Sequence, residues 1–175
     1  IERADITALG ASKTILDRRS IEVQDGPGVI EVPWIGDASE VVLLDVTLHT
    51  ANAWSGFTYS PWFLNIPHDD VVFETGSSTI NTSEEPKLQQ LKKELESVVE
   101  KYGSMVPVKL YIGGCTDTVG DAAANRTLSQ QRARSIGAWL AANDISIPIF
   151  FYGFGEGWLA ESTGDGVASA ANRRA

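Results

Sequence analysis

The feature that constrains the fold most is a helical pattern set between short β-type runs, and it begins near residue 71. One helical face is apolar at alternating spacings of three and four residues, at Leu88, Leu91, Leu95, Val98 and Tyr102. Apolar runs over residues 71–73, 108–112 and 147–152 indicate strands, and a second helical pattern covers residues 122–142. This β-α-β-α-β order predicts an α/β or α+β domain. Right-handed crossovers would join its parallel strands, with the two helices on one face or split between faces.

Both ends of the first helix carry local signals. Ser83 is a suitable N-cap, because its hydroxyl can accept a hydrogen bond from an N–H that the helix leaves unpaired. Pro86 falls in the first turn, where its missing N–H does no harm. Gly103 follows the last apolar position, as is typical of a helix C-terminus. The sequence therefore predicts a helix between Ser83 and Gly103.

Residues before 71 have a β-type pattern instead. The strand candidates are residues 21–23, 29–32, 41–49, 57–59 and 62–64. The first two flank Asp25-Gly26-Pro27-Gly28, which is a strong turn signal. We therefore expect a small all-β module of four or five strands over residues 20–70, as a sandwich or a sheet. Residues 1–19 are expected to be poorly structured, or helical around 14–19, and residues 71–175 to form the β-α-β-α-β domain.

Composition excludes several classes of function. The formal net charge is −9, with 23 acidic against 14 basic residues, and most of the excess lies in residues 1–70. A nucleic-acid-binding protein needs a basic surface, so we expect no nucleic-acid partner. Cys115 is the only cysteine, which excludes an intrachain disulfide and a cysteine zinc cluster. No apolar run approaches membrane-spanning length. We also expect no metal or other cofactor.

The segment between the second strand and the second helix holds the strongest candidate site. Asp117 lies just beyond a strand's carboxyl end, at the rim where open α/β sheets bind ligands. Arg132 lies on the following helix, where a neighbouring loop can meet it. An acid beside an arginine can also be a purely structural ion pair, so this pair alone leaves both interpretations open.

The spacing around these two residues resembles a known family. Gly114-x-Thr116-Asp117-x-x-Gly120, followed by Asn125-x-x-Leu128-Ser129-x-x-Arg132-Ala133, is similar to the OmpA-like (OmpA C-terminal/MotB/Pal) peptidoglycan-binding domain. Supporting matches are Phe73-Glu74-Thr75-Gly76-Ser77 through Ile80, Gly153-Phe154-Gly155-Glu156 and Asn172-Arg173-Arg174. These landmarks cover residues 71–175 in the family's order.

The resemblance implies a mixed sheet with two helices, and non-covalent binding of peptidoglycan stem peptides through meso-diaminopimelate. The side-chain end of diaminopimelate carries an ammonium beside a carboxylate. Asp117 would accept from the ammonium, and Arg132 would offer a bidentate fork to the carboxylate. Asn125 would supply a further polar contact, and Arg173 would line the same pocket. The remaining contacts would be backbone N–H groups around Gly76 and from Thr116 through Thr118 to Val119.

Two positions depart from the family pattern. Cys115 stands where the family often has His, a residue that supports the loop more than it touches the ligand. The sequence also ends at Ala175, where the family usually continues into a last strand that would help to fix Arg173. We therefore expect either a truncated chain or a sheet without that strand.

The predicted role is an anchor without catalytic activity. We expect it in the periplasm or outer membrane of a Gram-negative bacterium, with an outer-membrane tether in a segment absent from this sequence. One alternative is a hydrolase of wall peptides or glycan that uses Asp117 as acid or base. Such an enzyme would need a second carboxylate or a metal at the same rim, and Asp121 is the only nearby candidate.

A second alternative is a protein-docking envelope module. Aromatic residues cluster before residue 71, at Trp34, Trp54, Phe57, Tyr59, Trp62 and Phe63. They indicate either the core of the small β module, packed against the second domain, or an exposed face that stacks on glycan or docks a protein.

Overall fold

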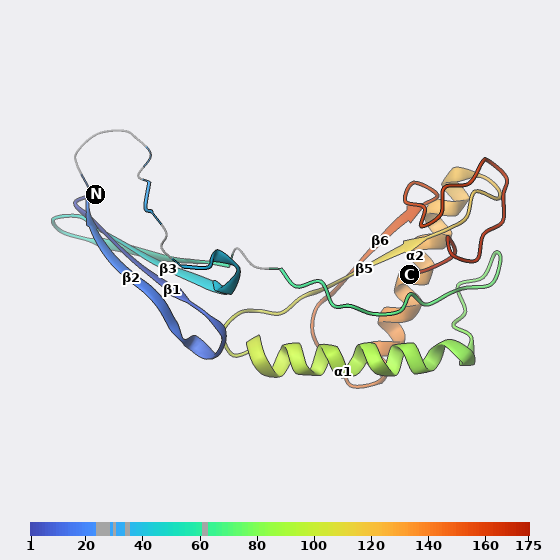
Figure 1. Ribbon diagram of the computed structural model, residues 1–175, viewed down its shortest axis with the longest axis horizontal. Coiled ribbons are helices and arrows are strands. Elements are labelled where there is room, and N and C mark those ends of the chain that lie inside the picture. The colour runs from blue at the N-terminus through green and yellow to red at the C-terminus, as the bar shows by residue number, and fades with distance from the viewer. Residues whose placement is uncertain (24–28, 30, 34–35, 61–62) are drawn as a thin grey trace. The chain divides into compact units, whose positions relative to one another are not determined.

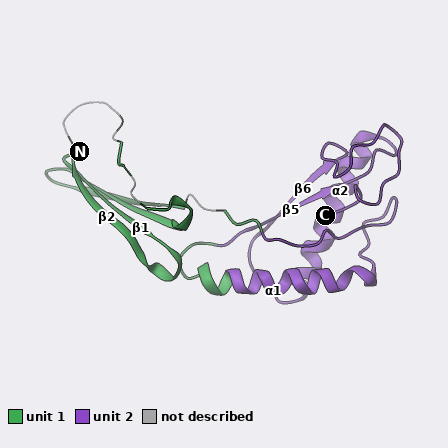
Figure 2. Cartoon of the chain, viewed as in Figure 1, with its two compact units in different colours: residues 1–65, 99–107 green, residues 66–98, 108–175 purple. Residues whose placement is uncertain are grey.

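The structure is a computed structural model of residues 1–175, and it describes all of them except residues 24–28, 30, 34–35 and 61–62 (Figure 1). The chain forms two compact units (Figure 2). Unit 1 contains residues 1–65 and 99–107, and unit 2 contains residues 66–98 and 108–175. Within the described part, no helix has both the length and the apolar character needed to cross a membrane.

Unit 1 is built on a four-stranded antiparallel sheet with strand order β2-β1-β3-β4. The strands are β1 (Arg3–Leu9), β2 (Ile15–Glu22), β3 (Leu43–His49) and β4 (Trp54–Tyr59). An antiparallel β-sheet is therefore present in the N-terminal part, but it begins at Arg3 and not at residue 20 as predicted. β3 and β4 confirm the strand candidates at 41–49 and 57–59. The described residues of 29–32 and 62–64 form no strand, and the predicted turn at 25–28 lies outside the described residues.

The expectation of a poorly structured or helical segment over residues 1–19 is wrong. This segment supplies β1 and most of β2. β1 contains two alanines, an aspartate and a threonine and therefore has a weak apolar pattern, but it pairs with β2 on one side and β3 on the other. Ala4 and Ala8 are buried as a result. Pairing with two neighbours determines strand formation here more than local propensity does.

Unit 2 contains two parallel strands, β5 (Leu110–Cys115) and β6 (Ile149–Gly155), and the helix α2 (Ala122–Ala142) between them. The helix α1 (Glu85–Tyr102) precedes β5 and extends beyond the unit at residue 99. Its start differs from the predicted Ser83 cap. A short 3-10 turn, Thr82–Glu84, comes first, and the Asn81 side chain accepts from the Ser83 N–H.

The C-terminal residues complete the sheet of unit 2. Val71 and Ala175 exchange backbone hydrogen bonds of 3.0 and 3.1 Å, and the Phe73 N–H donates to the Arg173 carbonyl at 2.9 Å. The Arg174 carbonyl accepts from the Cys115 N–H at 2.7 Å. The last residues thus bridge residues 71–73 and β5, with an antiparallel pairing that makes the arrangement mixed. This short pairing fixes Arg173 without a longer last strand.

Helix α2 lies directly on one face of the two parallel strands (Figure 1). Glycines make this approach possible, since a Cβ on Gly114 would lie 2.0 Å from the Ser129 carbonyl oxygen. A Cβ on Gly153 would lie 2.5 Å from that of Arg126. Both helices and the sheet share one core, formed by Val71, Phe73, Leu88, Leu95, Ile112, Ala133, Ile136, Leu140, Ile145 and Ala175.

Candidate ligand-binding site

Asp117 lies two residues beyond the carboxyl end of β5, in the loop that leads into α2. The Thr116 N–H donates to the Gly155 carbonyl at 2.8 Å, which ties this loop to the end of β6. Asp117 is only 4% exposed. Its Oδ2 accepts from Arg173 Nη1 at 3.0 Å and from the Ser169 N–H at 3.3 Å. Its Oδ1 accepts no hydrogen bond from any described residue and is reached by solvent, so one oxygen of this carboxylate is available to a ligand.

Arg132 projects from α2 and is fully buried. Its guanidinium donates to three backbone carbonyls, those of Ser77 at 3.0 Å, Cys115 at 2.8 Å and Glu74 at 3.1 Å. The same group lies over the Phe73 ring, 5.3 Å from its centroid. Arg132 therefore clamps the 74–77 loop against the end of β5. One N–H on each terminal nitrogen has no acceptor among the described residues.

The three charges at the rim interact, although Arg132 and Asp117 do not form the direct ion pair that the sequence pattern allowed. Asp117 pairs with Arg173 instead. Burial lowers the pKa of Arg132, the negative charge of Asp117 opposes that shift, and the positive charge of Arg173 adds to it. Two guanidiniums therefore lie near the Asp117 carboxylate, and the Glu156 carboxylate lies at the same site through its bond to Asn125.

Asn125, in the first turn of α2, holds the loop together. Its Nδ2 donates to Glu156 Oε2 at 2.8 Å and lies 3.2 Å from the Val119 carbonyl and 3.4 Å from that of Asp117. Asp121 caps the same helix, because its Oδ1 accepts from two backbone N–H groups, at 3.0 and 2.9 Å. Asp121 thus has a structural role as the N-cap of α2.

The loop residues predicted to contact the ligand differ in what they can offer. The Thr116 N–H is already used, and its Oγ1 is buried without a partner among the described residues. Thr118 Oγ1 donates to the Gly164 carbonyl at 2.6 Å and accepts from the Val167 N–H at 3.0 Å. The N–H groups of Asp117, Thr118 and Val119 donate to no described residue. They form a short run of free donors beside Asp117.

Gly76 forms the second side of the predicted cradle. It has a φ of +68°, which a residue with a side chain adopts only with strain, and open space lies where its Cβ would be. The Ser77 N–H donates to the Glu74 carbonyl at 3.1 Å and closes the turn around Gly76. Since Arg132 holds the carbonyls of both Glu74 and Ser77, the Gly76 turn is fixed beside Cys115 at the end of β5.

Sequence reasoning assigned no role to three residues that shape this site. Glu156 accepts from Asn125, and the Ser169 N–H donates to Asp117. Asn172 is fully buried and bonds the backbone of Ala160 and Glu161, which fixes the segment that leads to Arg173. Glu156 and Asn172 stand within motifs that the resemblance had marked. Ser169 contributes only a backbone group, for which the sequence contains no signal.

Comparison with known proteins identifies the family. The sequence model of the OmpA family matches residues 72–173, which is more than half of the chain. The chain belongs to the OmpA family. The family assignment confirms the resemblance carried by the motifs around Asp117 and Arg132.

Relatives match the OmpA-like part over a limited length. Outer membrane protein A of Serratia odorifera is 38% identical over 76 residues, which is 43% of this chain and 29% of that protein. Outer membrane protein A of Serratia marcescens is 38% identical over 88 residues, 50% of this chain and 23% of that protein. The chain thus spans less than a third of the length of these relatives. Their names confirm the predicted location in the outer membrane or periplasm of a Gram-negative cell.

A solved structure confirms the predicted fold class. The crystal structure of the peptidoglycan-associated lipoprotein from Burkholderia pseudomallei has a TM-score of 0.50 and 24% sequence identity. It covers 60% of this chain and 84% of the other. At this level of identity, the similarity supports the OmpA-like architecture of two helices and a mixed sheet.

Proposed function

We propose that unit 2 binds peptidoglycan non-covalently through the meso-diaminopimelate of the stem peptide, and that this binding anchors the envelope to the cell wall. The observation that carries the proposal is the buried Asp117 carboxylate with one oxygen free, beside unused N–H groups. A zwitterionic ligand end needs an anionic acceptor and cationic or N–H donors within a few ångströms of each other. Binding alone is proposed, with no reaction at this site.

The charged groups of the site indicate where the ammonium and the carboxylate of the ligand would each bind. The ligand ammonium would donate to Asp117 Oδ1, because Oδ2 is already occupied by Arg173 and Ser169. The ligand carboxylate would accept from the free N–H groups of residues 117–119 and from the unused N–H groups of Arg132. Arg132 donates to backbone carbonyls and forms no ion pair with a described residue, which favours a ligand that brings its own carboxylate.

In this proposal the remaining predicted residues act mainly by positioning. Asn125 holds the loop that carries the free N–H groups, and Thr118 ties the same loop to residues 164–167. Arg173 orients the Asp117 carboxylate and adds positive charge. Gly76 leaves open space at the edge of the site.

Co-sedimentation with diaminopimelate-type sacculi tests the proposal. Asp117→Asn keeps the shape of the side chain and removes its charge, and we expect it to weaken binding by about tenfold to a hundredfold, the range for one charge-assisted contact. Asp165→Asn is the matched control, since Asp165 is exposed in the neighbouring loop and forms no ion pair with a described residue. Equal sedimentation of the two folded variants would overturn the proposal. Release of soluble wall fragments by the wild-type chain would favour the hydrolase.

A further inference from the structure

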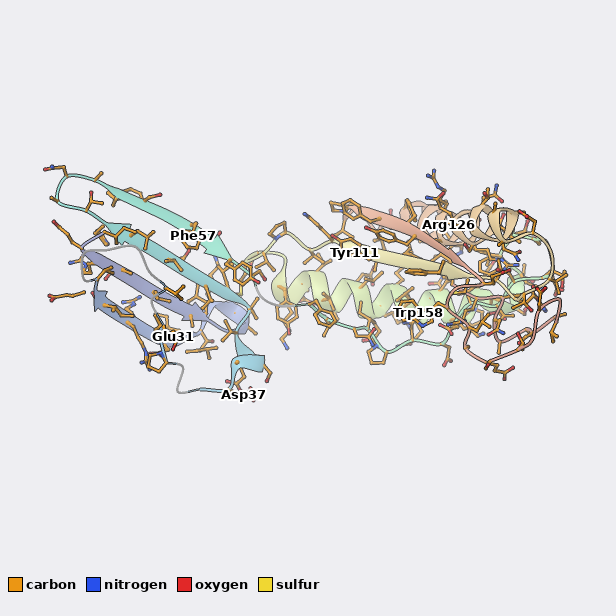
Figure 3. The ribbon with its side chains drawn as sticks, turned by 90° about the horizontal axis from the view of Figure 1, so that it is seen from above. Glu31, Asp37, Phe57, Tyr111, Arg126 and Trp158 are labelled. Carbon is orange, nitrogen blue, oxygen red and sulfur yellow. The ribbon has the colours of Figure 1, made fainter. Side chains whose placement is uncertain are left out.

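The face of β5 and β6 that is turned away from α2 carries a row of exposed aromatic side chains. We call this row the aromatic ridge; it consists of Tyr111, Phe150, Tyr152, Phe154 and Trp158, each between 41% and 62% exposed. Successive ring centroids lie between 5.0 and 6.5 Å apart. Phe150 stacked on Tyr111 forms one end of the row, and Trp158 forms the other (Figure 3). Contiguous exposed apolar side chains of this kind mark interaction sites.

Local sequence keeps the aromatic ridge in order. Strand alternation turns Ile112 into the core and leaves Tyr111 outside. A Cβ on Gly113 would lie 2.7 Å from Phe154 Cε2, so glycine gives that ring its place over β5. The Gly157 N–H then donates to the Phe154 carbonyl at 3.0 Å. This turn brings the Trp158 ring edge-on to Phe154, with centroids 5.1 Å apart.

We propose that the aromatic ridge binds sugar rings of the glycan strand that carries the stem peptide. The proposal rests on the proposed function, because it extends the same ligand beyond its peptide. The outward positions within the two strands carry aromatic residues or Gly113, so the strands themselves offer stacking surfaces and no ionic group. Pyranose rings present flat faces of C–H groups, and these are attracted to the electron-rich faces of aromatic rings.

The Trp158 end of the aromatic ridge lies near the rim that carries the proposed stem-peptide site, since the Thr116 N–H donates to the carbonyl of Gly155, three residues before Trp158. Arg173 Nη1 contacts Asp117 Oδ2 at 3.0 Å, and the next residue, Arg174, contacts the Trp158 carbonyl through Nη2 at 3.4 Å. Adjacent residues thus touch the proposed peptide site and the last residue of the ridge. Diaminopimelate is the third residue of the stem, and three extended residues span about 10 Å. A bound stem therefore holds its sugar within reach of this end of unit 2.

Calorimetric titration of the full chain can separate the two parts of the ligand. The probes are a free diaminopimelate stem tripeptide, the same tripeptide on its N-acetylglucosamine–N-acetylmuramic acid disaccharide, and a peptide-free oligosaccharide of the same glycan. We expect Trp158→Ala and Tyr152→Ala each to lower the affinity for the disaccharide-peptide by about threefold to tenfold, a typical range for one aromatic contact. The free tripeptide should bind these variants as it binds the wild type.

The matched control is Trp54→Ala, since Trp54 is 72% exposed and lies in unit 1. It should leave all affinities unchanged, whereas loss of glycan affinity in this variant would assign the sugar contact to unit 1 and overturn the proposal. If the wild type bound the free tripeptide and the disaccharide-peptide with equal affinity, the sugar-binding role of the aromatic ridge would be overturned. The proposed function would not be affected. If neither peptide bound but the oligosaccharide bound in a Trp158-dependent way, the proposed function would be wrong. Sugar binding by the aromatic ridge would then be supported. Ridge variants that only turned a dimer into a monomer would show a self-association surface instead.

Discussion

Replacing Arg132 by lysine should destabilise unit 2 strongly, although the charge is kept. The guanidinium donates in three directions, to the carbonyls of Ser77, Cys115 and Glu74. A lysine ammonium is a single point and cannot reach three acceptors placed around a planar fork. Loss of two of these bonds, each worth about 1.5–3 kcal/mol for a charged donor, predicts a loss of about 3–6 kcal/mol in the free energy of unfolding.

The assay is urea unfolding followed by far-UV circular dichroism, in which α1 and α2 together give the helical signal. Arg126→Lys is the control, because Arg126 lies on the same helix, is exposed and donates from its side chain to no described residue (Figure 3). If the urea midpoint of unfolding for Arg132→Lys matched that of Arg126→Lys, the stabilising role assigned to the Arg132 guanidinium would be refuted. It would mean that the three carbonyls are satisfied equally well without the guanidinium fork.

Two further predictions concern titratable groups. Burial raises the pKa of the Glu84 carboxyl, but hydrogen bonds from Lys87 and from the Val72 N–H outweigh it and leave the pKa below its ordinary value. The contribution of the ionised Glu84 carboxylate to stability should therefore be complete above about pH 5 and fall as the pH drops through the folded pKa. Glu84→Gln should accordingly reduce the loss in the free energy of unfolding at acidic pH. Burial also raises the pKa of the Cys115 thiol, so a thiol reagent at pH 8 should label Cys115 only once urea has unfolded the chain. Rapid labelling of the native chain would contradict the burial of the Cys115 thiol.

The sequence predicted unit 2 well because its helices have strong periodicity. The second helix covers residues 122–142 as predicted, and the strand–helix alternation correctly indicated parallel strands. Asp117 was placed at the sheet rim from its position after a strand. Residues 1–19 were predicted wrongly because β1 depends on pairing with strands on both sides.

The partners of the site residues could not be predicted, for a related reason. Arg132 binds carbonyls from two separate segments, and backbone acceptors have no residue-specific signal. Asp117 and Arg173 are 56 residues apart and meet only because residues 173–175 pair with residues 71–73. The exposed aromatics of β4, Trp54, Phe57 and Tyr59, are not buried in the core of unit 1. Trp34 and Trp62 lie outside the described residues, and the docking or stacking role of this cluster stays a prediction.

The central claim is that the rim of unit 2 recognises an ammonium and a carboxylate on one ligand. Calorimetric titration of three matched stem tripeptides, with diaminopimelate, amidated diaminopimelate or lysine at the third position, tests it most directly. Lysine leaves the unused N–H groups of Arg132 without an anion, and an unpaired group of this kind costs on the order of 1–3 kcal/mol. We predict that affinity falls in the order diaminopimelate, amidated diaminopimelate, lysine, with about tenfold to a hundredfold between first and last. Equal affinity for the lysine peptide would contradict the claim and leave the charges at this rim with a purely structural role.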